Sequence, residues 1–93
     1  MAMYETQEVK EKVPETVRPV IWFMLQELNE PSPNHHFELS IIEVDGETRQ
    51  HIVHTQKNTD YCREFSFKCP EAVHESVFIV GFDQNKWLML LKP

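Results

Sequence analysis

Residues 77–91 decide the fold of this chain, and they read VFIVGFDQNKWLMLL. Two apolar runs, 77–82 and 87–91, flank the polar loop 83–86, which is the pattern of a β-hairpin. Successive side chains of a strand point to opposite faces of the sheet. A four-residue loop places one set on one face, Phe78, Val80, Phe82, Trp87, Met89 and Leu91, and a second set on the other, Val77, Ile79, Leu88 and Leu90. Because both sets are apolar, we predict a hairpin that is covered on both sides.

The second apolar face of this hairpin needs a cover of its own. A helix of about thirteen residues is only ~20 Å long, so it covers part of one sheet face. Two further covers are compatible with the sequence: the sheet curls into a half-barrel, or a second subunit packs on it. Large apolar patches are unusual on monomers, so the sequence favours a homodimer or a protein partner.

A second hairpin is predicted upstream, over residues 36–56. Apolar and polar residues alternate over residues 37–41, and Asp45-Gly46 is a pair that type I′ turns prefer. With a two-residue loop, Leu39 lies opposite Ile52. A three-residue loop pairs Leu39 with Val53 instead, and this alternative stays open.

The N-terminal third is predicted to contain an edge strand over residues 4–10 and one amphipathic helix over residues 15–28. Thr16 is the expected N-cap of this helix. A proline-rich connector, residues 29–35, ends it. The helix is indicated by apolar residues that recur at a period of 3.6, namely Val17, Val20, Ile21, Met24, Leu25 and Leu28.

Together these elements predict an α+β fold, with one amphipathic helix packed on an antiparallel, curved sheet of four to six strands. A third strand over residues 61–68 joins the two hairpins, so the sheet occupies residues 36–91. The chain has 93 residues, which is the size of one domain. We therefore predict a single domain over residues 1–93.

Charge and composition exclude several classes of protein. The net charge is −6, whereas a protein that binds a nucleic-acid backbone needs a basic footprint. The longest apolar run, residues 20–25, is far shorter than the ~18 residues that cross a bilayer. The first residues lack the basic and apolar regions of a secretory signal. Cys62 and Cys69 are therefore expected as reduced thiols in the cytoplasm.

The sequence contains no motif that identifies a catalytic, cofactor or metal site. His51 and His54 are an odd number of residues apart, so on a regular strand they point to opposite faces and cannot share an ion. Ser40, Ser66 and Ser76 have no paired base at a readable spacing. Only two glycines are present, too few for a phosphate-binding loop. We assign no catalytic residue, cofactor or metal ligand.

Among the five histidines, His54 is the best candidate for a structural or functional role. In the favoured hairpin register it lies on the core side, opposite Phe37, with Gln56 and Tyr61 close in the sequence. A buried imidazole needs a hydrogen-bond partner, and either residue is suited to supply one. The alternative is a small-ligand or enzymatic pocket formed by His54, Gln56 and Tyr61.

Tyr61, Arg63, Phe65 and Phe67 alternate along one strand and suggest a further alternative. Aromatic rings interleaved with basic residues are typical of surfaces that stack single-stranded nucleic acid. The negative net charge argues against this partner, and packing of the same rings into the core is favoured over it.

Several stretches together resemble domain of unknown function 960, a family of small bacterial proteins found mainly in Gram-positive species. The most specific stretch is Ile52–Gln56 with Tyr61, where the family has serine at the position of Thr55. Pro19 and the pair His35-His36 depart from the family pattern. The resemblance covers about residues 4–91 and rests also on the stretches 12–16, 20–28, 37–40 and 89–91. It implies a cytoplasmic protein and brings no activity, cofactor or catalytic residue with it.

The sequence therefore predicts a non-enzymatic cytoplasmic module that binds a protein or a second copy of itself, and no membrane. The predicted contact surface consists of Trp22, Phe23, Ile79, Leu88 and Leu90.

Overall fold

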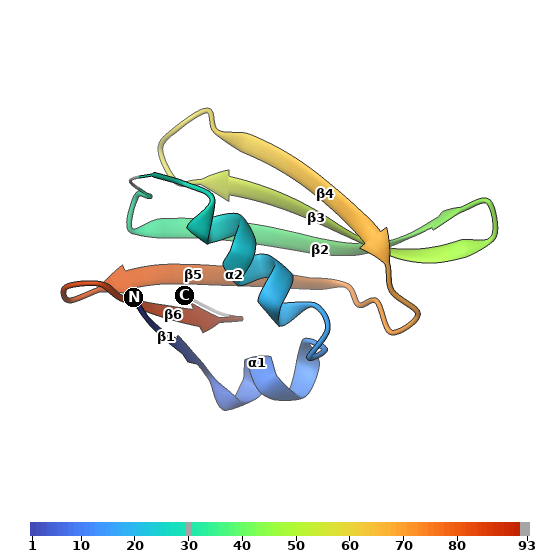
Figure 1. Ribbon diagram of the computed structural model, residues 1–93, viewed down its shortest axis with the longest axis horizontal. Helices are drawn as coiled ribbons and strands as arrows, with labels where there is room; N and C mark the ends of the chain where they lie inside the picture. Colours follow the sequence, from blue (N-terminus) through green and yellow to red (C-terminus); the bar gives the residue numbers. More distant parts are fainter. Residues whose placement is uncertain (30, 92–93) are drawn as a thin grey trace.

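The structure, a computed structural model, describes residues 1–29 and 31–91. Within these residues the elements follow one another as β1 (Ala2–Glu5), α1 (Gln7–Lys12), α2 (Arg18–Gln26), β2 (Asn34–Val44), β3 (Glu47–Gln56), β4 (Cys62–Lys68), β5 (Glu75–Phe82) and β6 (Lys86–Leu90). The strands form one sheet in the order β1-β6-β5-β2-β3-β4. Figure 1 shows this sheet face-on, with the β2–β3 hairpin projecting beyond the helices. The α+β class is confirmed.

The sheet is mixed, so the prediction of a purely antiparallel sheet is wrong. Four of its strand pairs are antiparallel, whereas β1 runs parallel to β6, with Met3 beside Trp87 and Glu5 beside Met89. A tight turn forces antiparallel pairing, but no turn joins β1 to β6. The direction of β1 is therefore set by the path of the intervening chain, which no local pattern reports.

The predicted strand 4–10 is wrong from residue 6 onward, because a helix begins there. Thr6 is the N-cap of α1, and its Oγ1 accepts a hydrogen bond from the backbone N–H of Val9 at 3.2 Å. Glu8 in the first turn and Lys12 in the last turn both interact favourably with the helix dipole, because each carries the charge opposite to that of its helix end. Capping and charge placement therefore favour a helix where charged residues suggested an edge strand.

The predicted helix 15–28 is present but shorter, as α2. Its apolar stripe is confirmed, since Ile21, Met24 and Leu25 are buried. Thr16 is not the N-cap, because Val17 occupies that position and no side chain caps the helix. The described part of the chain thus holds two short helices instead of one. Neither reaches the length and hydrophobicity that a membrane span requires.

The β2–β3 hairpin has the favoured register, with Leu39 opposite Ile52 and Phe37 opposite His54. Asp45 and Gly46 have φ angles of 52° and 78°, as both central residues of a type I′ turn require. The two-residue loop is therefore confirmed. β2 begins at Asn34, so the predicted connector 29–35 ends two residues early.

The C-terminal hairpin has a three-residue loop, so the predicted faces of its second strand are exchanged. Phe82 pairs with Lys86, and Asp83 and Asn85 adopt positive φ angles in the loop. Because the side-chain period is two, a loop shorter by one residue moves every side chain of β6 to the other face. As a result, Ile79 lies beside Met89, and Val80 lies beside Leu88.

The hydrophobic core lies between the two helices and one face of the sheet, the helix-covered face. The helical segment contributes six of the core residues named below, between Val9 and Leu25, and the strands contribute the other six, between Phe37 and Met89. The buried core includes Val9, Val13, Val17, Ile21, Met24, Leu25, Phe37, Leu39, Ile52, Val77, Ile79 and Met89.

The other face of the sheet, the open face, has no helix over it in residues 1–29 and 31–91. The strand order runs from edge β1 to edge β4, so the sheet does not close into a barrel. The single chain therefore leaves one side of the C-terminal hairpin without the predicted cover. We call the apolar side chains on this side of β1, β6 and β5 the apolar half of the open face. They are Tyr4, Phe78, Val80, Phe82, Leu88 and Leu90.

Candidate functional site

Two histidines meet in the core, on neighbouring strands. His54 on β3 is fully buried, and His35 on β2 is 2% exposed. His35 Nδ1 lies 2.9 Å from His54 Nε2, and His35 Nε2 lies 2.6 Å from the carbonyl oxygen of Ser32. The sequence places His54 correctly on the core side but does not indicate His35 as its partner, because the two are diagonal neighbours in the register.

The chain of hydrogen bonds assigns the protons of this pair. The carbonyl of Ser32 only accepts, so His35 carries its proton on Nε2 and accepts at Nδ1. His54 therefore donates through Nε2. Its Nδ1 atom is left as a buried acceptor without a protein partner.

Burial keeps both imidazoles neutral. Desolvation lowers the pKa of His35, against a smaller upward effect of its hydrogen bond to Ser32. Desolvation, with smaller Coulombic contributions from His35 and Arg63, lowers the pKa of His54 to about 3. A group with so low a pKa is a weak general base at neutral pH. The geometry therefore suits a rigid core pair better than proton transfer.

Gln56 and Tyr61 lie beside this pair, but neither supplies the hydrogen bond expected for His54, which is made by His35. Gln56 Oε1 accepts a hydrogen bond from the backbone N–H of Ser32 at 3.0 Å. The ring of Tyr61 contacts His54 edge-on, with 5.1 Å between the ring centroids. The ring of Phe37 stacks on the imidazole of His54, with 4.1 Å between the centroids. The structure contains hollows of about 330 and 390 Å³, and neither is lined by His54, Gln56 or Tyr61. The three side chains pack against their neighbours instead.

The five residues of the predicted contact surface do not share one surface. Ile79 is fully buried and Trp22 is 7% exposed, both in the core. Phe23 is 59% exposed, but it belongs to α2 on the helix side. Leu88 and Leu90 lie on the open face. The grouping of Ile79 with Leu88 and Leu90 is wrong because the loop of the C-terminal hairpin is one residue shorter than predicted.

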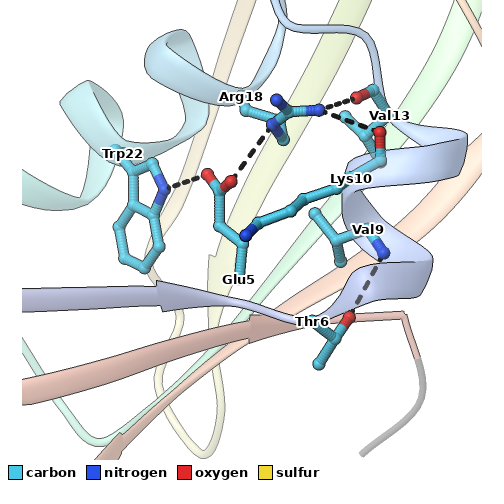
Figure 2. A network of polar contacts seen from close by, with 7 residues as sticks. All are labelled: Glu5, Thr6, Val9, Lys10, Val13, Arg18 and Trp22. Carbon is cyan, nitrogen blue, oxygen red and sulfur yellow. Dashed lines mark hydrogen bonds and ion pairs between the residues drawn. The ribbon is translucent and has the colours of Figure 1, made fainter.

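Figure 2 shows why Trp22 is held inside. Its indole N–H donates to Glu5 Oε2 at 2.8 Å, and Arg18 Nε lies 3.2 Å from Glu5 Oε1. Arg18 also donates to the carbonyls of Val13 and Lys10 at 2.7 and 3.2 Å, where α1 ends. This network joins β1, α1 and α2. Nothing in the local pattern of the sequence indicates it.

The aromatic strand β4 lies at an edge of the sheet, with Tyr61, Arg63, Phe65 and Phe67 on the helix-covered side. Phe67 packs against the core, while Phe65 is 44% exposed. The guanidinium of Arg63 lies 3.8 Å from the carboxylate of Glu27 at the end of α2. One of the charges expected to attract a nucleic acid is therefore paired within the chain.

The three serines that the sequence leaves without a base all lie on the polar part of the open face. Ser40 Oγ lies 3.3 Å from His51 Nδ1. Ser66 Oγ accepts a hydrogen bond from Arg49 at 3.3 Å, and Ser76 donates to Glu38 at 2.5 Å. The favoured register of the β2–β3 hairpin already places Ser40 opposite His51, so this base could have been found from the sequence.

The remaining chemistry of the chain concerns its cysteines and possible metal ligands. The thiol of Cys69 is buried and donates to Glu71 Oε1 at 3.2 Å. Burial and this hydrogen bond raise its pKa, so it stays a protonated thiol. Among residues 1–29 and 31–91, no three His, Cys, Asp or Glu side chains are grouped to hold a metal ion.

Comparison with known proteins identifies the fold but no activity. No protein-family model matches the chain, and no curated protein sequence matches it. A crystal structure of a protein of unknown function from Enterococcus faecalis is similar, with a TM-score of 0.69 and 17% sequence identity. The match covers 98% of this chain and 87% of that one. At this identity the likeness concerns the fold alone, and no biochemical activity is assigned to the chain.

Proposed function

We propose that this protein is a non-enzymatic, self-associating module, in which a second copy packs on the apolar half of the open face. The observation that carries the proposal is a continuous set of apolar side chains on three adjacent strands, over which the described residues place no second layer. Tyr4 and Phe82 are 47% and 43% exposed, and their rings lie 5.9 Å apart. Removing such surface from water contributes about 25 cal/mol per Å².

The charges of the open face favour a second copy over an acidic or basic partner. Its strand residues include three bases, Arg49, Lys68 and Lys86, and three acids, Glu38, Glu47 and Glu64. This face is therefore neutral, whereas the whole chain carries −6. Two copies that meet through it avoid the like-charge repulsion that their other surfaces produce.

The size of the face is also sufficient. The molecule measures 43 by 30 Å along its two longer axes. A stable interface buries about 800 Å² on each partner, which is a part of that face. A two-fold axis places the same patch on both copies, so the apolar half of one copy meets the apolar half of the other.

Sedimentation equilibrium over a wide range of concentrations tests this proposal. We expect a dimer for the wild type and a monomer for Phe82→Lys, because the new ammonium group is buried without a partner in the interface. Leu88→Lys is a second variant at the centre of the patch. Phe23→Lys is the matched control, because Phe23 is more exposed and lies on the opposite side.

Circular dichroism verifies that each variant is folded. A wild type that stays monomeric at every concentration contradicts the proposal. Equal effects of Phe82→Lys and Phe23→Lys contradict it as well.

We also infer a cytoplasmic location and membership of the domain of unknown function 960 family. The two free cysteines support a reducing compartment. The family is supported by its most specific stretch, Ile52–Gln56 with Tyr61, in which His54 is buried and Tyr61 packs against its ring.

A further inference from the structure

Three polar side chains form a row across three neighbouring strands of the open face. Ser40 on β2 lies directly opposite His51 on β3, and Glu64 on β4 is a diagonal neighbour of His51, because it pairs with Val53. His51 Nδ1 is 3.3 Å from Ser40 Oγ, and His51 Nε2 is 2.9 Å from Glu64 Oε1. The imidazole therefore lies between a hydroxyl and a carboxylate.

The carboxylate determines which nitrogen of His51 is free to act as a base. An ionised carboxylate only accepts hydrogen bonds, so His51 donates to Glu64 through Nε2–H. In the neutral imidazole the lone pair is then on Nδ1, which faces the hydroxyl of Ser40. This is the order of nucleophile, base and orienting carboxylate that activates a serine.

A buried amide on the other side of the sheet holds the backbone of the two central residues. Gln50 is fully buried, and its Nε2 donates to the carbonyls of Ser40 and His51 at 3.0 and 3.4 Å. The same side chain is held by hydrogen bonds to Val73 N and O at 2.9 and 3.0 Å. The geometry of the row therefore rests on the core and not on mobile surface side chains alone.

We propose that Ser40 is a nucleophilic serine and a site of covalent acylation by small activated carboxylic esters. Ser40 Oγ attacks the ester carbonyl carbon while its proton moves to His51 Nδ1. The bond to the leaving oxygen breaks, and the electron pair departs with the alkoxide or phenolate. The products are an acylated Ser40, the leaving group and a protonated His51 beside Glu64. The imidazolium of His51 then releases its proton to solvent. One such acylation modifies the protein and is compatible with a non-enzymatic module.

The same face supplies two internal controls. Ser66 pairs with His51 across the strands, but the two ring nitrogens of His51 are directed to Ser40 and Glu64. The hydroxyl of Ser66 instead accepts from Arg49, whose guanidinium has no lone pair to accept a proton. Ser76 donates to Glu38, and the same carboxylate oxygen lies 3.1 Å from His36 Nε2. In that second group the carboxylate is between the serine and the histidine, so no imidazole faces the hydroxyl.

The test treats the whole protein with 4-nitrophenyl acetate and measures acetylation of each serine by peptide mass spectrometry. We expect Ser40 to react about 10²-fold faster than Ser66 and Ser76, which is the ordinary gain from a positioned general base. His51→Gln is expected to lower acetylation of Ser40 by the same factor, and Glu64→Gln by a smaller one.

Equal acetylation of the three serines overturns the proposal, and so does an unchanged rate at Ser40 in His51→Gln. Both variants alter surface side chains, and circular dichroism verifies their fold. Repeating the measurement on Phe82→Lys separates this result from self-association, because Ser40 lies outside the apolar half.

Discussion

His54 illustrates what burial does to one side chain. Its pKa is lowered to about 3 by desolvation, with His35 and Arg63 adding to the effect. In the unfolded chain the same group titrates near pH ~6.5. Below that pH the unfolded state binds a proton that the folded state does not, so acid shifts the equilibrium toward unfolding.

We therefore expect the free energy of unfolding to fall by about 1 kcal/mol for His54 alone between pH 7 and pH ~5.5, where carboxylates hardly titrate. Urea unfolding at a series of pH values measures this slope. His54→Phe is expected to reduce the slope, because it removes one of the depressed histidines.

His74→Gln is the control for this slope, since His74 is exposed. A slope in His54→Phe equal to that of the wild type would show that His54 is not the group that titrates.

For His54, the sequence pattern predicts the position of the residue in the core but not its hydrogen-bond partner. The core position of His54 follows from Asp45-Gly46 and the alternation around it, because a type I′ turn sets the register of its own hairpin. Its bond to His35 depends on the direction in which two rings turn inside the core. That information lies in packing, which strand periodicity does not contain.

At the scale of elements, the network around Arg18 joins three elements of low intrinsic stability. α1 has six residues and β1 has four, so neither is stable by itself. Arg18 binds the carbonyls at the end of α1 and the carboxylate of Glu5 on β1. A single side chain from α2 thus binds both elements, in addition to the backbone pairing of β1 with β6.

Arg18→Met is expected to lower the free energy of unfolding by about 2 kcal/mol, since hydrogen bonds to a charged group contribute about 1.5–3 kcal/mol. Chemical denaturation measures this change, and Trp22 fluorescence reports the loss of the contact with Glu5.

Lys12→Met is the matched control, because the Lys12–Glu8 pair is exposed and such pairs contribute about 0–1 kcal/mol. If both substitutions have the same small effect, the network does not hold these elements together.

At the scale of the whole molecule, the sheet has one covered face and one open face, and the proposed self-association through the open face links this shape to stability. A dimer that forms only from folded chains shifts the folding equilibrium by mass action. The melting temperature of the wild type is therefore expected to rise with protein concentration.

Differential scanning calorimetry at several concentrations measures this rise, and Phe82→Lys is expected to lack it. Phe23→Lys, on the helix side, is expected to retain the concentration dependence. A wild-type melting temperature that is the same at every concentration contradicts self-association through the open face.

Local patterns were sufficient for much of this protein. The period of 3.6 around Ile21 and Met24 predicted α2, and the alternation around Leu39 with the Asp45-Gly46 turn predicted a hairpin in its correct register. These features depend on residues close together in the chain, where the backbone period and the turn geometry act directly.

Contacts between distant segments needed the assembled sheet. The parallel pairing of β1, the open side of the C-terminal hairpin and the row from Ser40 to Glu64 all depend on which strands become neighbours. One residue in the loop before Lys86 was enough to exchange the two faces of β6, because side chains alternate with a period of two. Pairing and loop parity are settled by packing over the whole chain, and for that reason the open face and its chemistry became visible only in three dimensions.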